Sequence, residues 1–460
     1  MSVSYADFLA AKSPRSVKRG LSTMPAISQR LFPFQRHCVQ FLLECGAGGA
    51  FLDTGLGKTL VQLEYLEHAR NTGNGYGLIL APLAVVKQIF REGAKFGYPV
   101  RAIRDQSEAA PGINICNYDR LHLLNPQAFC AVTLDEAGIL KSFSGKTTRT
   151  LIDAFADHRW KVPATATPAP NDHMELGQHS EFCGIMNSNE MLSRFFINDT
   201  ANASQSWRLK RHGVEAFWDW MASWCRFAML PSDLGGDDAG FILPGLHIHR
   251  HRAAESAPVL GDLFGDAIVS ATNLHQIKRE TAQRRARIAV DLAMSQTGEP
   301  WVMWCDTDYE ADEILAAIGD APGVVEVRGS MKADSKEAAL DAFSIGDARV
   351  LVTKPSVAGF GMNWQHCANT VFVGRSFSYE TWYQAVRRFW RFGQQREVNV
   401  HLVVAEGEDS IARVIDRKAG SHAEMKAEMR GAMRRNDSRE SARKVAYRPT
   451  HKGHLPSWIA

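Results

Sequence analysis

The 460-residue sequence lacks any apolar run long enough to cross a bilayer. Its longest apolar stretch, 78–86, contains Pro82 and falls well short of the roughly 20 residues that a transmembrane helix needs. Residues 1–12 also lack the charged segment and apolar block of a secretory signal peptide. We therefore expect a soluble, cytoplasmic protein with no membrane partner.

Cysteine is sparse and unpatterned. The eight cysteines include no Cys-x-x-Cys pair and mostly lie in apolar stretches, as reduced core residues do. His247, His249 and His251 alternate with Arg250 and Arg252, so on a strand the histidines would share one face. No cysteine or carboxylate pattern accompanies them, and the spacing does not predict a metal site.

A large excess of one charge is also missing, since 53 Lys and Arg face 50 Asp and Glu, a net charge of +3. The balance is nevertheless uneven along the chain. Residues 411–460 hold 12 basic and 5 acidic residues, or +7, which leaves 41 against 45, or −4, for the rest. This basic tail predicts contact with a polyanion, and a solvated basic helix is the alternative.

The length exceeds what one hydrophobic core supports, so at least two domains are expected. After a leader over 1–30, short apolar stretches alternate with helical patterns over 31–183. That alternation predicts a parallel sheet covered by helices, with its ligand at the carboxyl ends of the strands. The expected strands are 50–53, 77–81, 113–116, 131–134 and 160–164, and the expected helices are 59–69, 85–96 and 147–156.

A second alternation covers 275–408 and predicts a second lobe of the same class. Its expected strands are 301–305, 323–327, 349–353, 370–373 and 398–404, and its expected helices are 275–294, 309–318, 336–343 and 378–391. The intervening 184–274 reads as a helical insertion and hinge rich in tryptophan. We expect helix 213–229 to pack its aromatic side chains on the first lobe, with a DNA-stacking surface as the alternative. Residues 409–460 form the basic helical tail.

The most informative motif follows the first expected strand. Gly55 and Gly57 allow a tight turn around phosphate, Lys58 supplies a cation, and Thr59 supplies a hydroxyl for Mg²⁺. The phosphate would then sit at a helix N-terminus, where free N–H groups favour anions. Leu52 stands where the full phosphate-loop pattern has glycine, so an ordinary strand-to-helix turn is the alternative.

Acidic and hydroxyl residues end two further strands. Asp135 and Glu136 follow the strand 131–134, where one carboxylate can hold Mg²⁺ and the other can orient and deprotonate an attacking water. A simple polar turn is the alternative. Thr165 and Thr167 follow the strand 160–164 beside the same site.

Arg388 and Arg391 in the second lobe are three residues apart and would share one face of the expected helix 378–391. Two arginines directed at a γ-phosphate are charge stabilisers of phosphoryl transfer. The alternative is a basic helix that faces solvent or DNA.

Together these segments resemble helicase superfamily two, of the DEAD/DEAH-box-like kind, and specifically its Swi/Snf-type DNA-dependent ATPases in a compact bacterial or phage form. The family carries Gly-Leu-Gly-Lys-Thr, Asp-Glu, Thr-x-Thr-Pro and Gln-Ala-x-x-Arg-x-x-Arg-x-Gly-Gln in this order, and all four stand here. The resemblance covers about 31–404. It departs at Arg387, where an acidic residue is usual, at Trp390, where His is usual, and at residues 52–54, where Asp-Glu-Met is usual.

The resemblance implies two tandem RecA-like α/β lobes that bind ATP and Mg²⁺ between them. It places Gln35 on adenine, Gly361 in a motif that touches nucleotide and DNA backbone, and Thr165 and Thr167 between the cleft and the DNA. Lys58, Asp135, Glu136, Arg388 and Arg391 would be catalytic, and Thr59 and Asp135 would hold the metal. The implied activity is ATP-driven translocation on double-stranded DNA, with a protein partner for targeting. A strand-separating helicase and an inactive DNA-binding scaffold are the alternatives.

Overall fold

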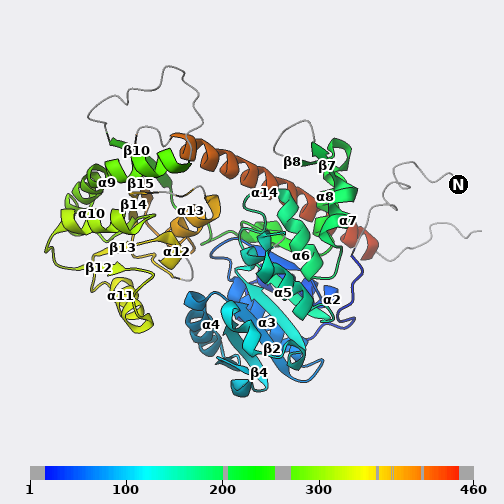
Figure 1. Ribbon diagram of the computed structural model, residues 1–460. Coiled ribbons are helices and arrows are strands. Elements are labelled where there is room, and N and C mark those ends of the chain that lie inside the picture. The colour runs from blue at the N-terminus through cyan, green and yellow to red at the C-terminus, as the bar shows by residue number, and fades with distance from the viewer. Residues whose placement is uncertain are drawn as a thin grey trace, which may run out of the picture.

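The computed structural model describes residues 16–143, 145–199, 206–253, 271–358, 362–374, 376, 378–405 and 409–444. These residues build two α/β lobes, each around its own parallel sheet, with one long C-terminal helix lying across both (Figure 1). The expected fold class is confirmed.

The first lobe contains a seven-stranded parallel sheet of order β3-β4-β2-β5-β6-β1-β9. Its strands are β1 (Gly49–Leu52), β2 (Tyr76–Ala81), β3 (Val100–Ala102), β4 (Gly112–Asn117), β5 (Ala131–Asp135), β6 (Trp160–Ala164) and β9 (Cys225–Ala228). Its principal helices are α2 (Pro33–Cys45), α3 (Lys58–Arg70), α4 (Leu83–Phe96), α5 (Lys146–Ala154), α6 (Leu176–Phe182), α7 (Ser188–Phe195) and α8 (Val214–Ala222).

The second lobe contains a six-stranded parallel sheet of order β10-β15-β14-β11-β13-β12. Its strands are β10 (Leu246–Ala253), β11 (Trp301–Trp304), β12 (Val324–Val327), β13 (Val350–Thr353), β14 (Asn369–Phe372) and β15 (Val398–Ala405). Its helices are α9 (Ala271–Met294), α10 (Asp308–Ile318), α11 (Ala333–Ile345), α12 (Pro355–Ala358) and α13 (Tyr379–Val386), and α14 (Asp409–Lys444) follows.

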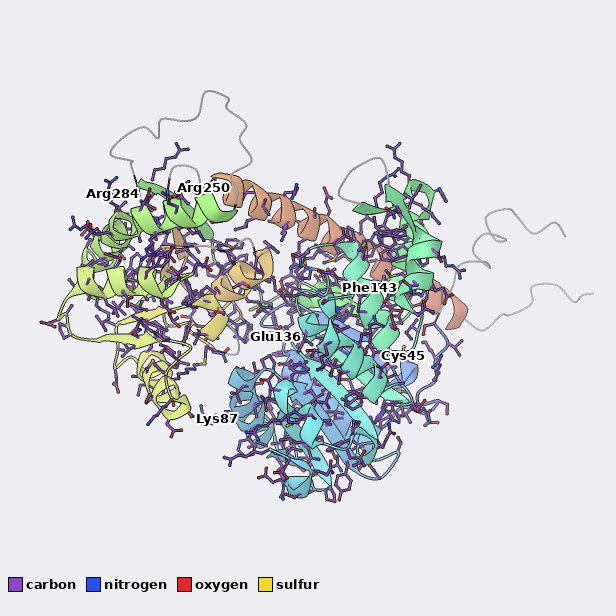
Figure 2. The ribbon with its side chains drawn as sticks, in the orientation of Figure 1. Cys45, Lys87, Glu136, Phe143, Arg250 and Arg284 are labelled. Carbon is purple, nitrogen blue, oxygen red and sulfur yellow. The ribbon has the colours of Figure 1, made fainter. Side chains whose placement is uncertain are left out.

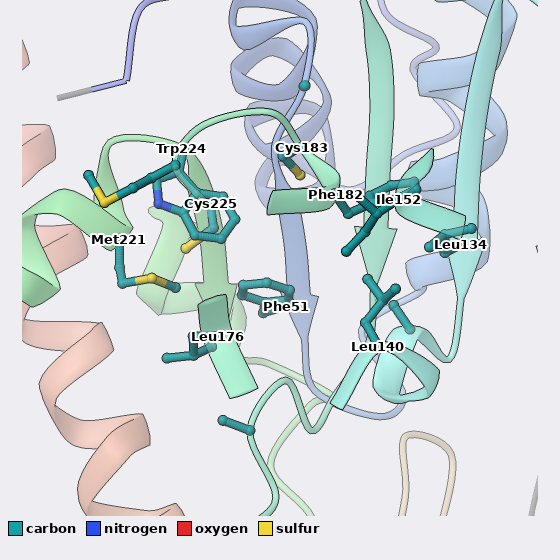
Figure 3. Packing of buried hydrophobic residues seen from close by; sticks show 14 of the residues in the cluster. Phe51, Leu134, Leu140, Ile152, Leu176, Phe182, Cys183, Met221, Trp224 and Cys225 are labelled. Atoms are coloured by element: carbon teal, nitrogen blue, oxygen red, sulfur yellow. The ribbon is translucent and has the colours of Figure 1, made fainter. Parts of the chain in front are cut away.

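Strand β1, which leads into the phosphate loop, is buried on both faces. Phe51 lies in a cluster with Met221 and Trp224 on one side of the sheet (Figure 3), while Leu52 packs into the cluster on the other side. Full burial of one such side chain is worth about 1.5–3 kcal/mol. This two-sided packing fixes the strand end from which the loop departs.

The stretch 184–274 contributes strands to both sheets and is less of an insertion than expected. β9 pairs with β1 in the first sheet, and β10 pairs with β15 in the second. Both were missed as sheet strands because charged residues interrupt them: Arg226 in β9 is buried with its guanidinium over the Phe41 ring, and β10 alternates His with Arg. Between α7 and α8 lies an antiparallel hairpin of β7 (Phe196–Asp199) and β8 (Ser206–Leu209).

The aromatic residues of this stretch belong to the core. Trp218, Trp220 and Trp224 are at most 1% exposed and pack in the main cluster of the first lobe. The expected packing role is therefore confirmed for these three, and they cannot stack on bases.

The described residues bear on membrane crossing, metal binding and cysteine pairing. Within the described ranges, no helix is long and apolar enough to cross a membrane. The histidines of β10 stack against His401, but no group of three or more ligating side chains that could hold a metal occurs in the described part of the chain. All eight cysteines are free thiols.

Helix α14 forms most of the expected basic helical tail. It extends to Lys444, and its Met425, Met429 and Met433 pack into the first-lobe core. Its basic side chains face carboxylates of the first lobe, as in the pairs Arg430–Asp233 at 2.6 Å and Arg435–Asp219 at 2.9 Å. These pairs thus complement charge between the positive tail and the negative body, and contact of the tail with a polyanion stays a prediction.

Candidate nucleotide site between the lobes

The phosphate loop has the backbone that its glycines predict. Gly55 and Gly57 have φ of 94° and 75°, a region that side chains rarely adopt, and α3 begins directly at Lys58. A Cβ on Gly57 would stand 2.3 Å from Gln35 Nε2, and one on Gly55 would stand 2.9 Å from the Phe392 amide nitrogen. Only glycine therefore fits at both turns.

Lys58 and Thr59 occupy the first turn of α3, where backbone N–H groups point toward the cleft. Lys58 Nζ donates to the carbonyl oxygen of Leu52 at 3.1 Å. Burial lowers the pKa of Lys58, and the charges of Glu136 and Asp135 partly offset that effect. The lysine is thus close to both carboxylates at the end of β5.

The carboxylates come from β5, which lies two strands from β1 with β6 between them. Gln62 Nε2 donates to Asp135 Oδ1 at 2.6 Å, and Tyr118 donates to the Asp135 carbonyl oxygen at 2.7 Å. Burial, followed by the charge of Glu136, raises the pKa of Asp135 to about 7.

Glu136 has φ 50° and ψ 53° and is the one non-glycine residue with positive φ among those that the structure describes. Such a backbone costs of order 1–3 kcal/mol and is concentrated at functional sites. Its label lies where the two lobes adjoin (Figure 2), and its Oε2 accepts from Gln384 of the second lobe.

Arg388 and Arg391 lie close together, as expected, but they do not share one face of a helix. Helix α13 ends at Val386, so both arginines lie in the turns that follow it, not on one helix face. Their guanidinium groups nevertheless converge on the Met362 carbonyl oxygen, at 3.3 Å from Arg388 Nη1 and 3.4 Å from Arg391 Nη1. Burial lowers the pKa of Arg388 to about 10 and that of Arg391 to about 9.

Gln384, for which the sequence motif predicted no role, connects the two lobes. Gln384 Nε2 donates to Glu136 Oε2 at 3.4 Å, and Gln384 Oε1 accepts from Arg388 Nη2 at 2.9 Å. One amide thereby joins the first-lobe carboxylate to the second-lobe arginine.

A second group missed by sequence reasoning surrounds Asp53, directly before the loop. Tyr383 donates to Asp53 Oδ1 at 2.6 Å, and Arg387 Nη2 and Lys426 Nζ lie 3.3 Å and 3.6 Å from Asp53 Oδ2. Although burial acts in the opposite direction, the charges of Arg387 and Lys426 hold the pKa of Asp53 well below its usual range. The sequence offered one signal for this group, because Arg387 stands where the resembled family usually has an acidic residue.

The remaining expected residues lie at the edges of this site. Gln35 Nε2 donates to the Leu56 carbonyl oxygen at 3.0 Å and its Oε1 accepts from the Phe32 amide at 2.9 Å, so its amide braces the loop. Thr165 and Thr167 are buried, and Thr167 Oγ1 donates to Glu380 Oε1 of α13 at 3.5 Å. Gly361 lies outside the described residues.

The charges of the cleft fit a polyphosphate. Three cations, Lys58, Arg388 and Arg391, lie within electrostatic reach of the carboxylate of Glu136. Arg391 Nε is buried without a hydrogen-bond partner in the described structure. An anion placed there would supply an acceptor for this donor, while Asp135 and the Thr59 hydroxyl offer the hard oxygen ligands that Mg²⁺ prefers.

Comparison with known proteins supports this arrangement. Residues 284–393 match the helicase conserved C-terminal domain. No curated protein sequence matches the chain.

Solved structures resemble it at low sequence identity. A fragment of the HsdR subunit of a type I restriction enzyme from Vibrio vulnificus is 15% identical, with a TM-score of 0.54, over 84% of this chain and 66% of that one. A SWI2/SNF2 ATPase core from Sulfolobus solfataricus, solved with dsDNA, is 17% identical over 92% of this chain and 99% of that one, with a TM-score of 0.42.

The family motifs thus occupy the strand ends and turns that border one cleft, and the lobe opposite the phosphate loop matches a helicase domain. The second lobe therefore contains a segment similar to the helicase conserved C-terminal domain, and the two lobes have a fold similar to that of the HsdR fragment.

Proposed function

We propose that this protein is a Swi/Snf-type motor that hydrolyses ATP with Mg²⁺ to translocate on double-stranded DNA. The observation that carries the proposal is the convergence of Lys58, Asp135 and Glu136 from one lobe with Arg388 and Arg391 from the other.

Each residue has a role that its position allows. Lys58 and the N–H groups at the start of α3 bind the phosphates, with Gly55 and Gly57 allowing their close approach. Thr59 and Asp135 would hold Mg²⁺, which neutralises phosphate charge when it is bound. Glu136 orients the attacking water and takes its proton.

The second lobe completes the reaction. Arg388 and Arg391 stabilise the charge that develops on the transferred phosphoryl group. Gln384 holds Arg388 and Glu136 in one hydrogen-bonded chain, so the arginine and the base are placed together. Hydrolysis therefore requires closed lobes, and release of phosphate removes the anion that both lobes share.

DNA would lie along the carboxyl ends of the second sheet. A cavity of about 230 Å³ lies there, lined by the donors Lys354, Ser356 and Thr381 and also by Asp306, and Lys354 pairs with Asp308 at 2.9 Å. Such donors contact phosphate oxygens in nucleic acid complexes. Thr167 connects the ATP cleft to α13, whose Thr381 lines this cavity. Gln35 remains the proposed contact to adenine, Gly361 the proposed link between nucleotide and DNA, and a targeting protein the proposed partner.

Steady-state ATPase rates without nucleic acid, and with single-stranded DNA, duplex DNA and RNA in turn, test this function. We expect duplex DNA to stimulate most and a third strand to be displaced from a triplex. ATPase activity unaffected by any nucleic acid would contradict the motor.

The hairpin β7–β8 favours one second candidate. Strand-separating helicases need an element that splits the duplex, and an antiparallel hairpin has the right form. Efficient ATP-dependent unwinding of a tailed duplex, lost when the hairpin is shortened, would establish that activity in place of translocation alone.

A further inference from the structure

The residue directly before the phosphate loop is an anchoring point for both the second lobe and the C-terminal helix. Asp53 is 5% exposed and contacts Lys426 of α14 and two residues of the arginine segment, by which we mean residues 383–391. These two are Tyr383 in α13 and Arg387 directly after it. Arg387 Nη2 also donates to the Thr54 carbonyl oxygen at 2.7 Å. Side chains from three segments that are far apart in sequence therefore meet two positions before Gly55.

The Asp53–Arg387 ion pair is buried, unlike an ion pair on the surface, and it fixes the position of Arg387 relative to the phosphate loop. Arg387 is 4% exposed and is the residue adjacent to Arg388 in the chain. Successive Cα atoms lie 3.8 Å apart across a trans peptide bond, so fixing Arg387 on Asp53 limits where the Arg388 backbone can stand. Removing one partner of a buried ion pair also destabilises a protein by several kcal/mol, so the contact that holds Arg387 on Asp53 is not easily broken.

We propose that Asp53 and Arg387 are positioning residues, which dock the arginine segment on the phosphate loop and so place Arg388 and Arg391 for phosphoryl transfer. Tyr383 and Lys426 complete the dock, and Lys426 makes the seating of α14 part of it. The inference rests on the proposed ATPase activity, since it assigns the arginines their place in that reaction.

The variants Arg387→Gln and Asp53→Asn remove the charge from either side of the dock. We expect each to lower kcat for ATP at saturating duplex DNA by roughly 10- to 100-fold, because about 1 Å of misplacement costs about 10² in rate. The Kd of mant-ATP should change less than threefold, because neither side chain is assigned to the nucleotide.

The double variant identifies a single shared contact. If the two residues act together, Asp53→Asn with Arg387→Gln should be no slower than the slower single variant. Rates that multiply would show independent roles and overturn the dock. Arg387→Lys keeps the charge but not the planar guanidinium, whose Nη2 contacts both Asp53 Oδ2 and the Thr54 carbonyl oxygen, and should recover part of kcat.

Lys87→Gln is the matched control. Lys87 pairs with Glu337 across the same two lobes, but it is 66% exposed and lies away from the phosphate loop (Figure 2). Exposed pairs are worth about 0–1 kcal/mol, so its kcat should stay within twofold of wild type. An equal loss in this variant would mean that any inter-lobe contact suffices, and would contradict the proposal.

Hydrogen–deuterium exchange separates the dock from the activity. Arg387→Gln should increase exchange over 384–394 without nucleotide, whereas Lys87→Gln should not. If wild-type protein hydrolyses no ATP but this exchange difference appears, the dock stands and the proposed function fails. Unchanged exchange together with unchanged kcat in Arg387→Gln refutes the dock.

Discussion

Arg388 is the residue at which activity and stability should separate most clearly. It is 3% exposed, and no carboxylate forms an ion pair with it among the described residues. Burial lowers its pKa to about 10, which corresponds to about 3 kcal/mol for keeping the group charged at neutral pH. Its three hydrogen bonds, to Gln384 and to the Met362 carbonyl oxygen, offset that cost.

The variant Arg388→Met keeps much of the side-chain volume and removes the charge. We expect kcat to fall by roughly 10³-fold or more, because an arginine at the transferred phosphoryl group contributes about that much. The affinity for ATP should fall far less, since the contact is strongest in the transition state. The free energy of unfolding should change by less than about 2 kcal/mol, because the lost hydrogen bonds and the relieved burial of charge nearly cancel.

Arg387→Met provides the adjacent comparison. Although burial lowers it, the charge of Asp53 more than compensates and the pKa of Arg387 is raised, so its removal leaves Asp53 less neutralised and should destabilise the protein by about 3–5 kcal/mol. Urea denaturation and steady-state kinetics on both variants give the answer. A kcat for Arg388→Met within tenfold of wild type, or a stability loss equal to that of Arg387→Met, would refute the reasoning.

Three further predictions follow from other positions. Lys58→Ala should abolish hydrolysis with DNA affinity nearly intact, whereas Glu136→Gln should retain bound ATP; turnover near wild type in either, measured by phosphate release, would remove these roles. Stability should fall on acidification from about pH 6.5 to about pH 4, because burial lowers the pKa of His179 to about 4 and the unfolded state therefore binds the proton first. His179→Gln should flatten that dependence in denaturation series. Met429→Ala in α14 should lower the free energy of unfolding by about 2–5 kcal/mol, because the side chain is fully buried in the first lobe; a loss below 1 kcal/mol would mean that the helix is only loosely seated.

Much of the fold could be predicted because its parallel strands are short apolar runs with a motif at each end. β6 has the predicted bounds, and β1, β2, β4 and β5 differ from them by one residue at one or both ends. β9 escaped prediction because its burial depends on partners distant in sequence: Arg226 is buried beside Phe41 and donates to the Ala222 carbonyl oxygen. The alternation in β10 showed which side chains share a face, but its pairing with β15 lies far along the chain and no local pattern records it.

The site was predictable where a residue's chemistry is general and not where it depends on the opposite lobe. The roles of a lysine, a threonine or a carboxylate at a strand end can be predicted from the neighbouring sequence alone. Asp53 and Gln384 gain theirs only when α13 reaches the phosphate loop, and no local pattern records that contact. The helix assigned to Arg388 and Arg391 was wrong because the chain turns after Val386, which tertiary contacts to Met362 stabilise.

The course of the chain restricts how the two lobes can move. The polypeptide passes from β9 to β10 through 229–245, and α14, some 54 Å long by its 36 residues, returns from the second lobe to the first. Near its start Asp416 pairs with Arg250 of β10, and further along Arg430 pairs with Asp233 of the first lobe (Figure 1). A body held at one point can swing about any axis, but a body held at two points swings only about the line that joins them. Each cycle of the cleft should therefore repeat the same arc, which turns the opening and closing of the lobes into a stroke of fixed direction.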